Sequence, residues 1–175
     1  MSLDDHQLAA QLAAEAGELL LSVREQLTAE DAPPSVLKAE GDRQAHELLM
    51  RRLAEERPDD AVLSEEGKDD LARLDAERTW IVDPLDGTRE FSEVPRTDWA
   101  VHVALVIDEA PVAGAVALPG LGVTLHTGDA PALPTSGAPT PRMIVSRSRP
   151  PVAALRLAAM LEVERREEDL EHLVC

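Results

Sequence analysis

Cysteine is almost absent from this sequence. The single cysteine, Cys175, is the last of 175 residues, which excludes an intrachain disulfide and a metal site built from cysteine thiolates. Long hydrophobic runs are also absent, because no window approaches the roughly 20 apolar residues that span a bilayer. The first eleven residues carry acids where a signal peptide would carry lysine or arginine. We therefore expect a globular protein of the cytoplasm with no membrane-spanning segment.

Basic residues are scarce. The chain has 17 lysines and arginines against 34 acids, a formal net charge of −17, which opposes binding to nucleic acid polymers and to anionic membranes. The same charge would repel a small phosphorylated molecule, unless the acids hold divalent cations that invert the local charge. The hydrophobic fraction of 44% and the mean hydropathy of −0.18 are those of one ordinary globular domain with a hydrophobic core.

Apolar residues at helical spacing predict two helices near the beginning of the chain. The first is expected over residues 4–27, with Asp4 or Asp5 as its N-cap. The two prolines of the segment 28–35 predict a loop, since proline does not continue a helix. The second helix is expected over residues 42–56.

Short apolar runs predict strands after these helices. A short strand running into a turn is expected within residues 60–67, a short helix near 69–77, and a buried strand over 79–83. Three runs between residues 98 and 128 predict a meander, and residues 143–148 predict a further strand. The predicted fold class is α+β, or layered α/β, with the N-terminal helices packed on a largely antiparallel sheet.

The end of the sequence has a different composition. Eight of the ten residues 162–171 are charged, which predicts a solvated helix or a frayed end. We therefore divide the chain into a domain at 1–161 and a charged tail at 162–175. A Pro-rich loop precedes this region at 129–142, and Arg147 and Arg149 follow it as solvated residues or phosphate contacts.

Asp83 and Asp86 lie three residues apart, where the strand 79–83 is expected to end. Pro84 fixes its own φ and favours an extended conformation at Asp83, so the chain turns and both carboxylates can face one side. Hard cations such as Mg²⁺ prefer oxygen ligands, and the Leu85 carbonyl between the aspartates can supply another. The alternative interpretation is a favourable turn sequence without a ligand.

Gly87 and Thr88 follow this turn. Gly87 lets the backbone approach a ligand closely, and the next residues are typical of the opening of a short helix, whose free N–H groups suit a phosphate. The Thr88 hydroxyl can orient a water molecule or bond a phosphate oxygen.

A second acidic pair, Glu65 and Glu66, follows another short apolar run. Two strand ends with paired acids could meet at one site, and Asp42 is a third candidate, with a helix N-cap as its alternative role. A two-metal site can activate a water molecule and stabilise the leaving oxygen in phosphate hydrolysis. The alternative is that these residues are surface acids of a very acidic protein.

Other polar and aromatic residues have simpler interpretations. His102 lies in an apolar strand and is expected to be a core histidine rather than a general base, and His46 is expected on a helix surface. Trp80 and Trp99 are expected in the core. Arg89 is expected either to contact a substrate phosphate or to pair with a neighbouring glutamate.

Three segments together resemble one known family: "DPLDGTREF" at 83–91, "LSEEG" at 63–67 and "GDRQAHELL" at 41–49. They are similar to the inositol monophosphatase-like family of lithium-sensitive, magnesium-dependent phosphatases. The residues after "DPLDGT" and the "SEE" segment are most similar to its CysQ branch, the 3'(2'),5'-bisphosphate nucleotidases, and to actinobacterial members of that branch. The resemblance runs from about residue 8 to about residue 161.

The resemblance implies roles for the acidic residues and their neighbours. It implies that two or three Mg²⁺ ions are bound by Glu65, Asp83, the Leu85 carbonyl and Asp86, with Asp83 bridging two of the ions. It implies that the substrate is contacted by Gly87, Thr88 and Arg89. It implies that the attacking water is positioned by Asp42 and Thr88, with support from Glu66.

The resemblance also implies a substrate: a small phosphorylated nucleotide, 3'-phosphoadenosine 5'-phosphate, cleaved to AMP and phosphate in sulfate assimilation. The alternatives are an inositol monophosphatase or fructose-1,6-bisphosphatase activity, and an inactive metal-binding remnant. Family members are longer and carry a second motif, Trp-Asp, whose aspartate completes the second metal site. No such motif follows residue 161, so we expect that site to be incomplete and an uncovered apolar face to favour association, for example as a homodimer.

Overall fold

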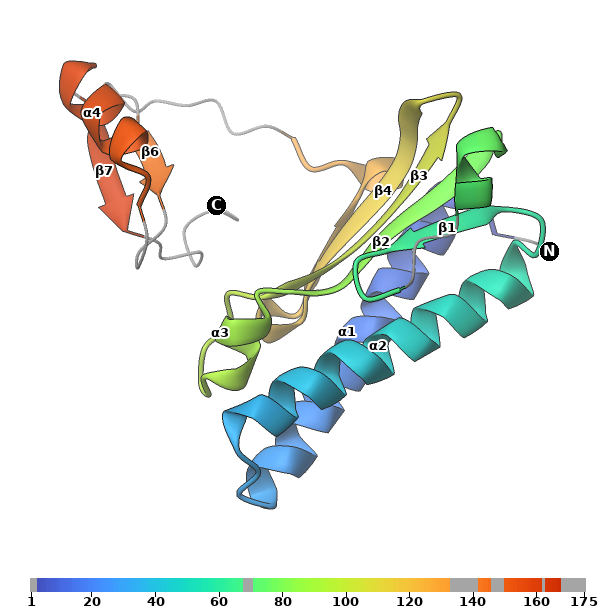
Figure 1. Ribbon diagram of the computed structural model, residues 1–175, viewed down its shortest axis with the longest axis horizontal. Helices are drawn as coiled ribbons and strands as arrows, with labels where there is room; N and C mark the ends of the chain where they lie inside the picture. The colour runs from blue at the N-terminus through green and yellow to red at the C-terminus, as the bar shows by residue number, and fades with distance from the viewer. Residues whose placement is uncertain (1–2, 68–70, 133–141, 146–149, 162, 168–175) are drawn as a thin grey trace. The chain divides into compact units, whose positions relative to one another are not determined.

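The computed structural model describes residues 3–67, 71–132, 142–145, 150–161 and 163–167 (Figure 1). The chain divides into two compact units, Met1–Pro131 and Ala132–Cys175, each described here by itself. The first unit contains two long helices and a five-stranded sheet, and it carries every candidate site residue.

Helix α1 spans Asp5–Ala29 and confirms the first predicted helix. Asp4 is its N-cap: the Asp4 carboxylate accepts a hydrogen bond from the Gln7 amide at 2.8 Å. The Gln7 side chain in turn accepts a bond from the Asp4 amide at 3.4 Å, which completes a capping box. The helix start therefore follows from local sequence chemistry.

Helix α2 spans Pro34–Glu56 and begins eight residues before the predicted start. The loop predicted over 28–35 is confirmed only for 30–33: residues 28 and 29 belong to α1, and Pro34 occupies the first turn of α2 after the N-cap Pro33. Proline is favoured there, since the first helical N–H groups have no partner within the helix. Asp42 consequently lies inside α2, and its alternative role as an N-cap is wrong.

The sheet has the order β1-β2-β3-β4-β5. Its strands are β1 (Ala61–Ser64), β2 (Arg78–Asp86), β3 (Ala100–Ile107), β4 (Ala110–Leu118) and β5 (Val123–His126). Strand β1 is parallel to β2, and the other pairs are antiparallel. The predicted meander and the predicted α+β fold class are confirmed. The short helix predicted before β2 is a 3₁₀ helix, η1, at Leu71–Asp75.

Helices α1 and α2 lie side by side against one face of the sheet, as Figure 1 shows. Burial alternates along β3, where Val101 and Val103 are fully buried against the helices. His102 lies between them and therefore belongs to the opposite face, so its prediction as a core histidine is wrong. Trp80 and Trp99 are buried, as predicted.

Strand β2 continues to Asp86, whereas the sequence predicted an end at Asp83. Asp83 pairs with His102 and Asp86 pairs with Ala100, with an irregularity in register between them. Pro84 lies in this irregular segment, where its missing N–H breaks no ladder bond. The two aspartates thus flank a bulge in a strand rather than a chain reversal.

The second unit contains β6 (Arg142–Val145), α4 (Val152–Met160) and β7 (Glu164–Glu167). Strand β6 confirms the beginning of the strand predicted at 143–148. Strands β6 and β7 pair in parallel, so the prediction of a helix or frayed end is wrong for Glu164–Glu167. Backbone pairing overrides the charged composition of this segment. The central part of the Pro-rich loop, Arg147, Arg149 and residues 168–175 lie outside the described residues.

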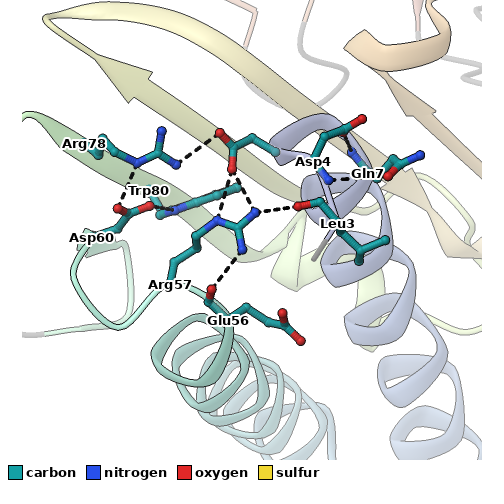
Figure 2. Close-up of polar contacts among 9 residues, drawn as sticks. Leu3, Asp4, Gln7, Glu56, Arg57, Asp60, Arg78 and Trp80 are labelled. Atoms are coloured by element: carbon teal, nitrogen blue, oxygen red, sulfur yellow. Dashed lines mark hydrogen bonds and ion pairs between the residues drawn. The ribbon is translucent and has the colours of Figure 1, made fainter. Parts of the chain in front are cut away.

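A network of charged side chains joins the start of α1, the end of α2 and β2 (Figure 2). The Asp60 side chain, 8% exposed, accepts hydrogen bonds from Arg78 Nε at 2.9 Å and Trp80 Nε1 at 2.8 Å. Asp5 accepts hydrogen bonds from Arg57 at 3.0 Å and Arg78 at 3.1 Å. Partial burial opposes ionisation of Asp5, but these hydrogen bonds lower its pKa.

We expect Asp60→Ala to lower the free energy of unfolding by about 3 kcal/mol, because the buried Trp80 indole and the part-buried Arg78 guanidinium then lose their acceptor. Urea unfolding at pH 7 measures the change, with the exposed neighbour Asp59→Ala as the matched control. Equal urea midpoints for the two variants would contradict a stabilising role of the network.

Candidate active site

The parallel pairing of β1 with β2 brings two acidic segments together. Ser64 pairs with Val82 in the last step of this ladder, so the residues that follow the two partners are neighbours. The amide of Glu65 donates to the Val82 carbonyl at 3.2 Å. Glu65 thereby lies beside Asp83, and Glu66 follows in the same turn. The structure brings together the two strand ends that the sequence singled out.

Helix α2 approaches the segment 85–91 closely at Gly41. A Cβ atom at this buried position would lie 2.8 Å from Phe91 Cε1 and 2.9 Å from Leu85 Cδ2, so a side chain does not fit without movement. Asp42 follows directly, and its Oδ1 lies 3.5 Å from Thr88 Oγ1, the long limit of a hydrogen bond. Gly41 therefore sets the distance between α2 and the "DGT" segment.

A short helix, α3 (Thr88–Ser92), begins where the sequence predicted one. Gly87 is its N-cap with φ 77°, in the left-handed region that favours glycine. Thr88 Oγ1 donates to the Leu85 carbonyl at 3.0 Å, and the Leu85 amide donates to Asp83 Oδ1 at 3.2 Å. These bonds hold the end of β2 and the first residue of α3 close together.

Negative charge is concentrated at this site. Burial, then the charges of Glu65 and Asp86, raise the pKa of Asp83 to about 6. Burial, then the charge of Glu66, raise the pKa of Asp42 to about 6, although the Thr88 hydroxyl opposes this shift. The carboxylates therefore destabilise one another when ionised, and a bound cation would relieve that repulsion.

The donor atoms at the site suit a hard divalent cation. Carboxylate and carbonyl oxygens are the ligands that Mg²⁺ prefers, and burial together with the charges of Glu65 and Asp86 makes ionised Asp83 unfavourable without a cation. Among the described residues, however, no group of three or more His, Cys, Asp or Glu side chains is already arranged as a metal site. The chemistry fits the ion, but the ligands are not gathered into a coordination sphere.

His102 is a neighbour that the sequence did not assign to the site. Its Nε2 lies 3.3 Å from Asp86 Oδ2, and the His102 side chain is 42% exposed. This hydrogen bond is the main cause that lowers the pKa of Asp86 and raises the pKa of His102. The alternation of Val101, His102 and Val103 was the signal that could have placed His102 on the sheet face opposite the helices.

Arg89 pairs with Glu93 along α3, with Arg89 Nε 2.9 Å from Glu93 Oε1. The sequence had left this pairing and a phosphate contact as alternatives. Both side chains are exposed, so the ion pair contributes little stability and a phosphate could compete for the guanidinium. The phosphate contact stays a prediction.

Arg24 was missed by sequence reasoning. It belongs to α1, is buried, and donates to the Arg96 carbonyl at 2.7 Å. Its guanidinium lies 5.6 Å from the Phe91 ring centroid and 5.7 Å from that of Trp99, and the two rings meet edge to face. Burial lowers the pKa of Arg24. Through these contacts Arg24 stabilises the position of the segment that follows Thr88.

Residues 4–138 match the inositol monophosphatase family. The chain belongs to this family. It is 48% identical over 174 residues to the 3'-phosphoadenosine 5'-phosphate phosphatase of Mycobacterium leprae (strain TN), an alignment that covers 93% of this chain and 64% of that protein. It is 31% identical over 152 residues to the 3'(2'),5'-bisphosphate nucleotidase CysQ of Escherichia coli (strain K12), covering 83% and 60%. The chain thus spans less than two thirds of either relative.

Solved structures of the same family share the fold. CysQ from Bacteroides thetaiotaomicron matches with a TM-score of 0.67 and 27% identity, covering 94% of this chain and 73% of that one. Staphylococcal IMPase-II matches with a TM-score of 0.71 at 22% identity, covering 94% and 64%, which shows the fold alone. No helix in the described part of this family member is long and apolar enough to cross a membrane.

The raised pKa of Asp42 predicts a pH-dependent stability. The folded state binds this proton more tightly than the unfolded state, in which the pKa of Asp42 has its ordinary value near 3.8. Ionisation therefore reduces stability as pH rises from about 4 to about 6. We expect Asp42→Asn to stabilise the metal-free protein by about 2 kcal/mol at pH 7.5 and by little at pH 4. Urea unfolding in EDTA at both pH values measures this difference. The same gain at both pH values, or an equal gain in Asp59→Asn, would contradict it.

Proposed function

We propose that this chain carries the Mg²⁺-binding site of a phosphatase that hydrolyses a small phosphorylated nucleotide. The proposed reaction is the cleavage of 3'-phosphoadenosine 5'-phosphate to AMP and phosphate. The observation that carries the proposal is the convergence of the acids that follow β1 and the acids at the end of β2 with Asp42 and Thr88, in a chain 48% identical to a 3'-phosphoadenosine 5'-phosphate phosphatase.

The proposed metal ligands are Glu65, Asp83, the Leu85 carbonyl and Asp86. When bound, Mg²⁺ would supply positive charge for the developing negative charge of phosphate hydrolysis and would acidify a water molecule. The carbonyl and two of the carboxylates belong to the end of β2, and Glu65 follows the adjacent end of β1, which supports a shared cation.

Asp42 and Thr88 are proposed to orient the attacking water. Thr88 Oγ1 lies 3.5 Å from Asp42 Oδ1 and 3.0 Å from the Leu85 carbonyl, so a water held between the hydroxyl and the carboxylate would sit at the mouth of the loop. A carboxylate whose pKa is about 6 is a suitable proton acceptor near neutral pH. Glu66 contributes by its negative charge, which raises the pKa of Asp42 more than the charges of Glu65 and Asp83 do.

Gly87 and Arg89 are proposed to contact the substrate phosphate. Gly87 places no side chain at the start of α3, and a Cβ there would lie 3.1 Å from the Asp98 carbonyl. Arg89 would exchange its exposed bond to Glu93 for a phosphate oxygen, a competition that favours the doubly charged anion.

Phosphate release from 3'-phosphoadenosine 5'-phosphate by the full chain tests the proposal, with and without Mg²⁺ and Li⁺. We expect Mg²⁺-dependent, Li⁺-inhibited release, with kcat/KM about tenfold or more above that for inositol 1-phosphate and fructose 1,6-bisphosphate. Preferential phosphate release from inositol 1-phosphate or fructose 1,6-bisphosphate would contradict the proposed substrate and support one of these two instead. Metal binding without any release would support an inactive metal-binding remnant. Sedimentation of the same sample tests the predicted homodimer.

A further inference from the structure

His46 lies on α2, four residues after Asp42, and residues at this spacing share one side of a helix. Its Nδ1 lies 2.9 Å from Oγ of Ser64, the last residue of β1. The imidazole is half-buried, so the prediction of a surface histidine is wrong. This hydrogen bond connects the helix that carries Asp42 with the strand end that carries Glu65.

Ser64 is buried and precedes the two glutamates directly. Its carbonyl accepts a hydrogen bond from the Gly67 amide at 3.3 Å, which closes the turn 64–67. A Cβ atom at Gly67 would lie 3.2 Å from His46 Cε1, so the imidazole also packs against the far end of the turn. His46 therefore contacts the turn at both of its ends, and the turn displays Glu65 and Glu66 between them.

We propose that His46 and Ser64 form a positioning pair that holds the turn 64–67 at a fixed distance from Asp42. The inference rests on the proposed function, because it concerns the geometry of the same acidic site. Asp42 and His46 belong to one helix and keep a fixed spacing, so the bond from His46 to Ser64 transmits the position of α2 to the turn. Neither side chain is required to touch the substrate or the ion.

The need for such a pair follows from charge. Asp42, Glu65, Glu66 and Asp83 repel one another when ionised, and Glu65 and Glu66 are exposed, so repulsion favours outward movement of the turn. The His46 bond and the bond from the Glu65 amide to β2 oppose this movement. Leaving the buried Ser64 hydroxyl without its partner would also destabilise the folded state, which favours the arrangement in which the His46 bond is formed.

Four variants of the full chain test the pair. His46→Ala and Ser64→Ala remove the hydrogen bond, whereas His46→Asn keeps a polar group at the place of Nδ1. His6→Ala is the matched control, because His6 Nδ1 also bonds a hydroxyl, Thr127 Oγ1 at 2.7 Å, but on α1. Mn²⁺ affinity by calorimetry, amide hydrogen exchange of residues 65–67 in EDTA, and phosphate release against Mg²⁺ concentration are the readouts.

We expect His46→Ala and Ser64→Ala to weaken Mn²⁺ binding about tenfold and to raise the Mg²⁺ concentration for half-maximal release by a similar factor. The kcat at saturating Mg²⁺ should change much less, since the pair acts on site geometry. Exchange at residues 65–67 should accelerate about tenfold in both variants. His46→Asn and His6→Ala should stay within about twofold of the unmodified chain in all three readouts.

Unchanged Mn²⁺ affinity and unchanged exchange in His46→Ala would overturn the inference. An equal loss in His46→Asn would also overturn it, because the bond to Ser64 would then not be the cause. If the unmodified chain neither binds Mn²⁺ nor releases phosphate, the proposed function fails, and the metal-free exchange data still decide whether His46 holds the turn.

Discussion

Asp83→Asn is expected to lower Mg²⁺-dependent phosphate release by about 1,000-fold, a transition-state cost of about 4 kcal/mol. Asp83 lies beside Glu65 across the β1–β2 pair, and the charges of both Glu65 and Asp86 act on it, so it is the central acid of the proposed ligand set. An amide keeps the shape of the side chain but removes the charge that attracts the cation. Phosphate release at saturating Mg²⁺ and Mn²⁺ calorimetry measure the loss.

The same substitution should stabilise the metal-free protein. The pKa of Asp83 is raised to about 6 by burial and by its acidic neighbours, so at pH 7.5 the folded state bears an unfavourable charge that Asn lacks. Scanning calorimetry in EDTA should therefore show a higher Tm for Asp83→Asn, and excess Mg²⁺ should raise the Tm of the unmodified chain more than that of the variant. Asp59→Asn is the control on the surface. Undiminished release, or a lower Tm in EDTA, would contradict the assignment of Asp83.

Gly41→Val is expected to reduce both stability and phosphate release. A Cβ at Gly41 would already lie 2.8 Å from Phe91 and 2.9 Å from Leu85, and valine adds two methyl groups. Overpacking of this kind costs about 3 kcal/mol. If α2 moves away to relieve the contact, Asp42 separates from Thr88, and a displacement of about 1 Å at reacting groups lowers turnover about 100-fold.

Urea unfolding and phosphate release measure the two effects of Gly41→Val. Gly114→Val is the matched control, since a Cβ at Gly114 would meet atoms at 3.8 Å and 3.9 Å, which is ordinary contact. Gly41→Ala should give an intermediate result. Wild-type release together with a urea midpoint equal to that of Gly114→Val would show that Gly41 does not set the distance between α2 and α3.

The sequence predicted the features that depend on local pattern. The capped start of α1 follows from Asp4 and Gln7, and the meander follows from three apolar runs with turn residues between them. The segment 83–88 could be identified as a candidate site because aspartates, glycine and threonine occur there at characteristic spacing. Its proximity to Glu65 was a hypothesis about two strand ends, and the pairing of Ser64 with Val82 is what places them together.

Features that depend on contacts between distant segments were beyond the sequence. One local feature was ambiguous as well: proline occurs both after the end and at the start of helices, so Pro34 was assigned to a loop although it begins α2. Arg24 has the helical spacing of a buried position, yet its partners are a carbonyl and two rings about 70 residues further along the chain. The bond from His46 to Ser64 likewise depends on how α2 crosses the end of β1.

Strand β1 has only four residues and lies at the edge of the sheet, whereas β2 lies between β1 and β3. The proposed ion site is therefore divided between a peripheral and a central strand. Fraying of β1 would carry Glu65 away while Asp83 and Asp86 keep their place, because short edge strands open locally at lower free energy than the core. Local opening of this sheet edge would therefore separate the proposed ligand residues while the rest of the sheet stays folded.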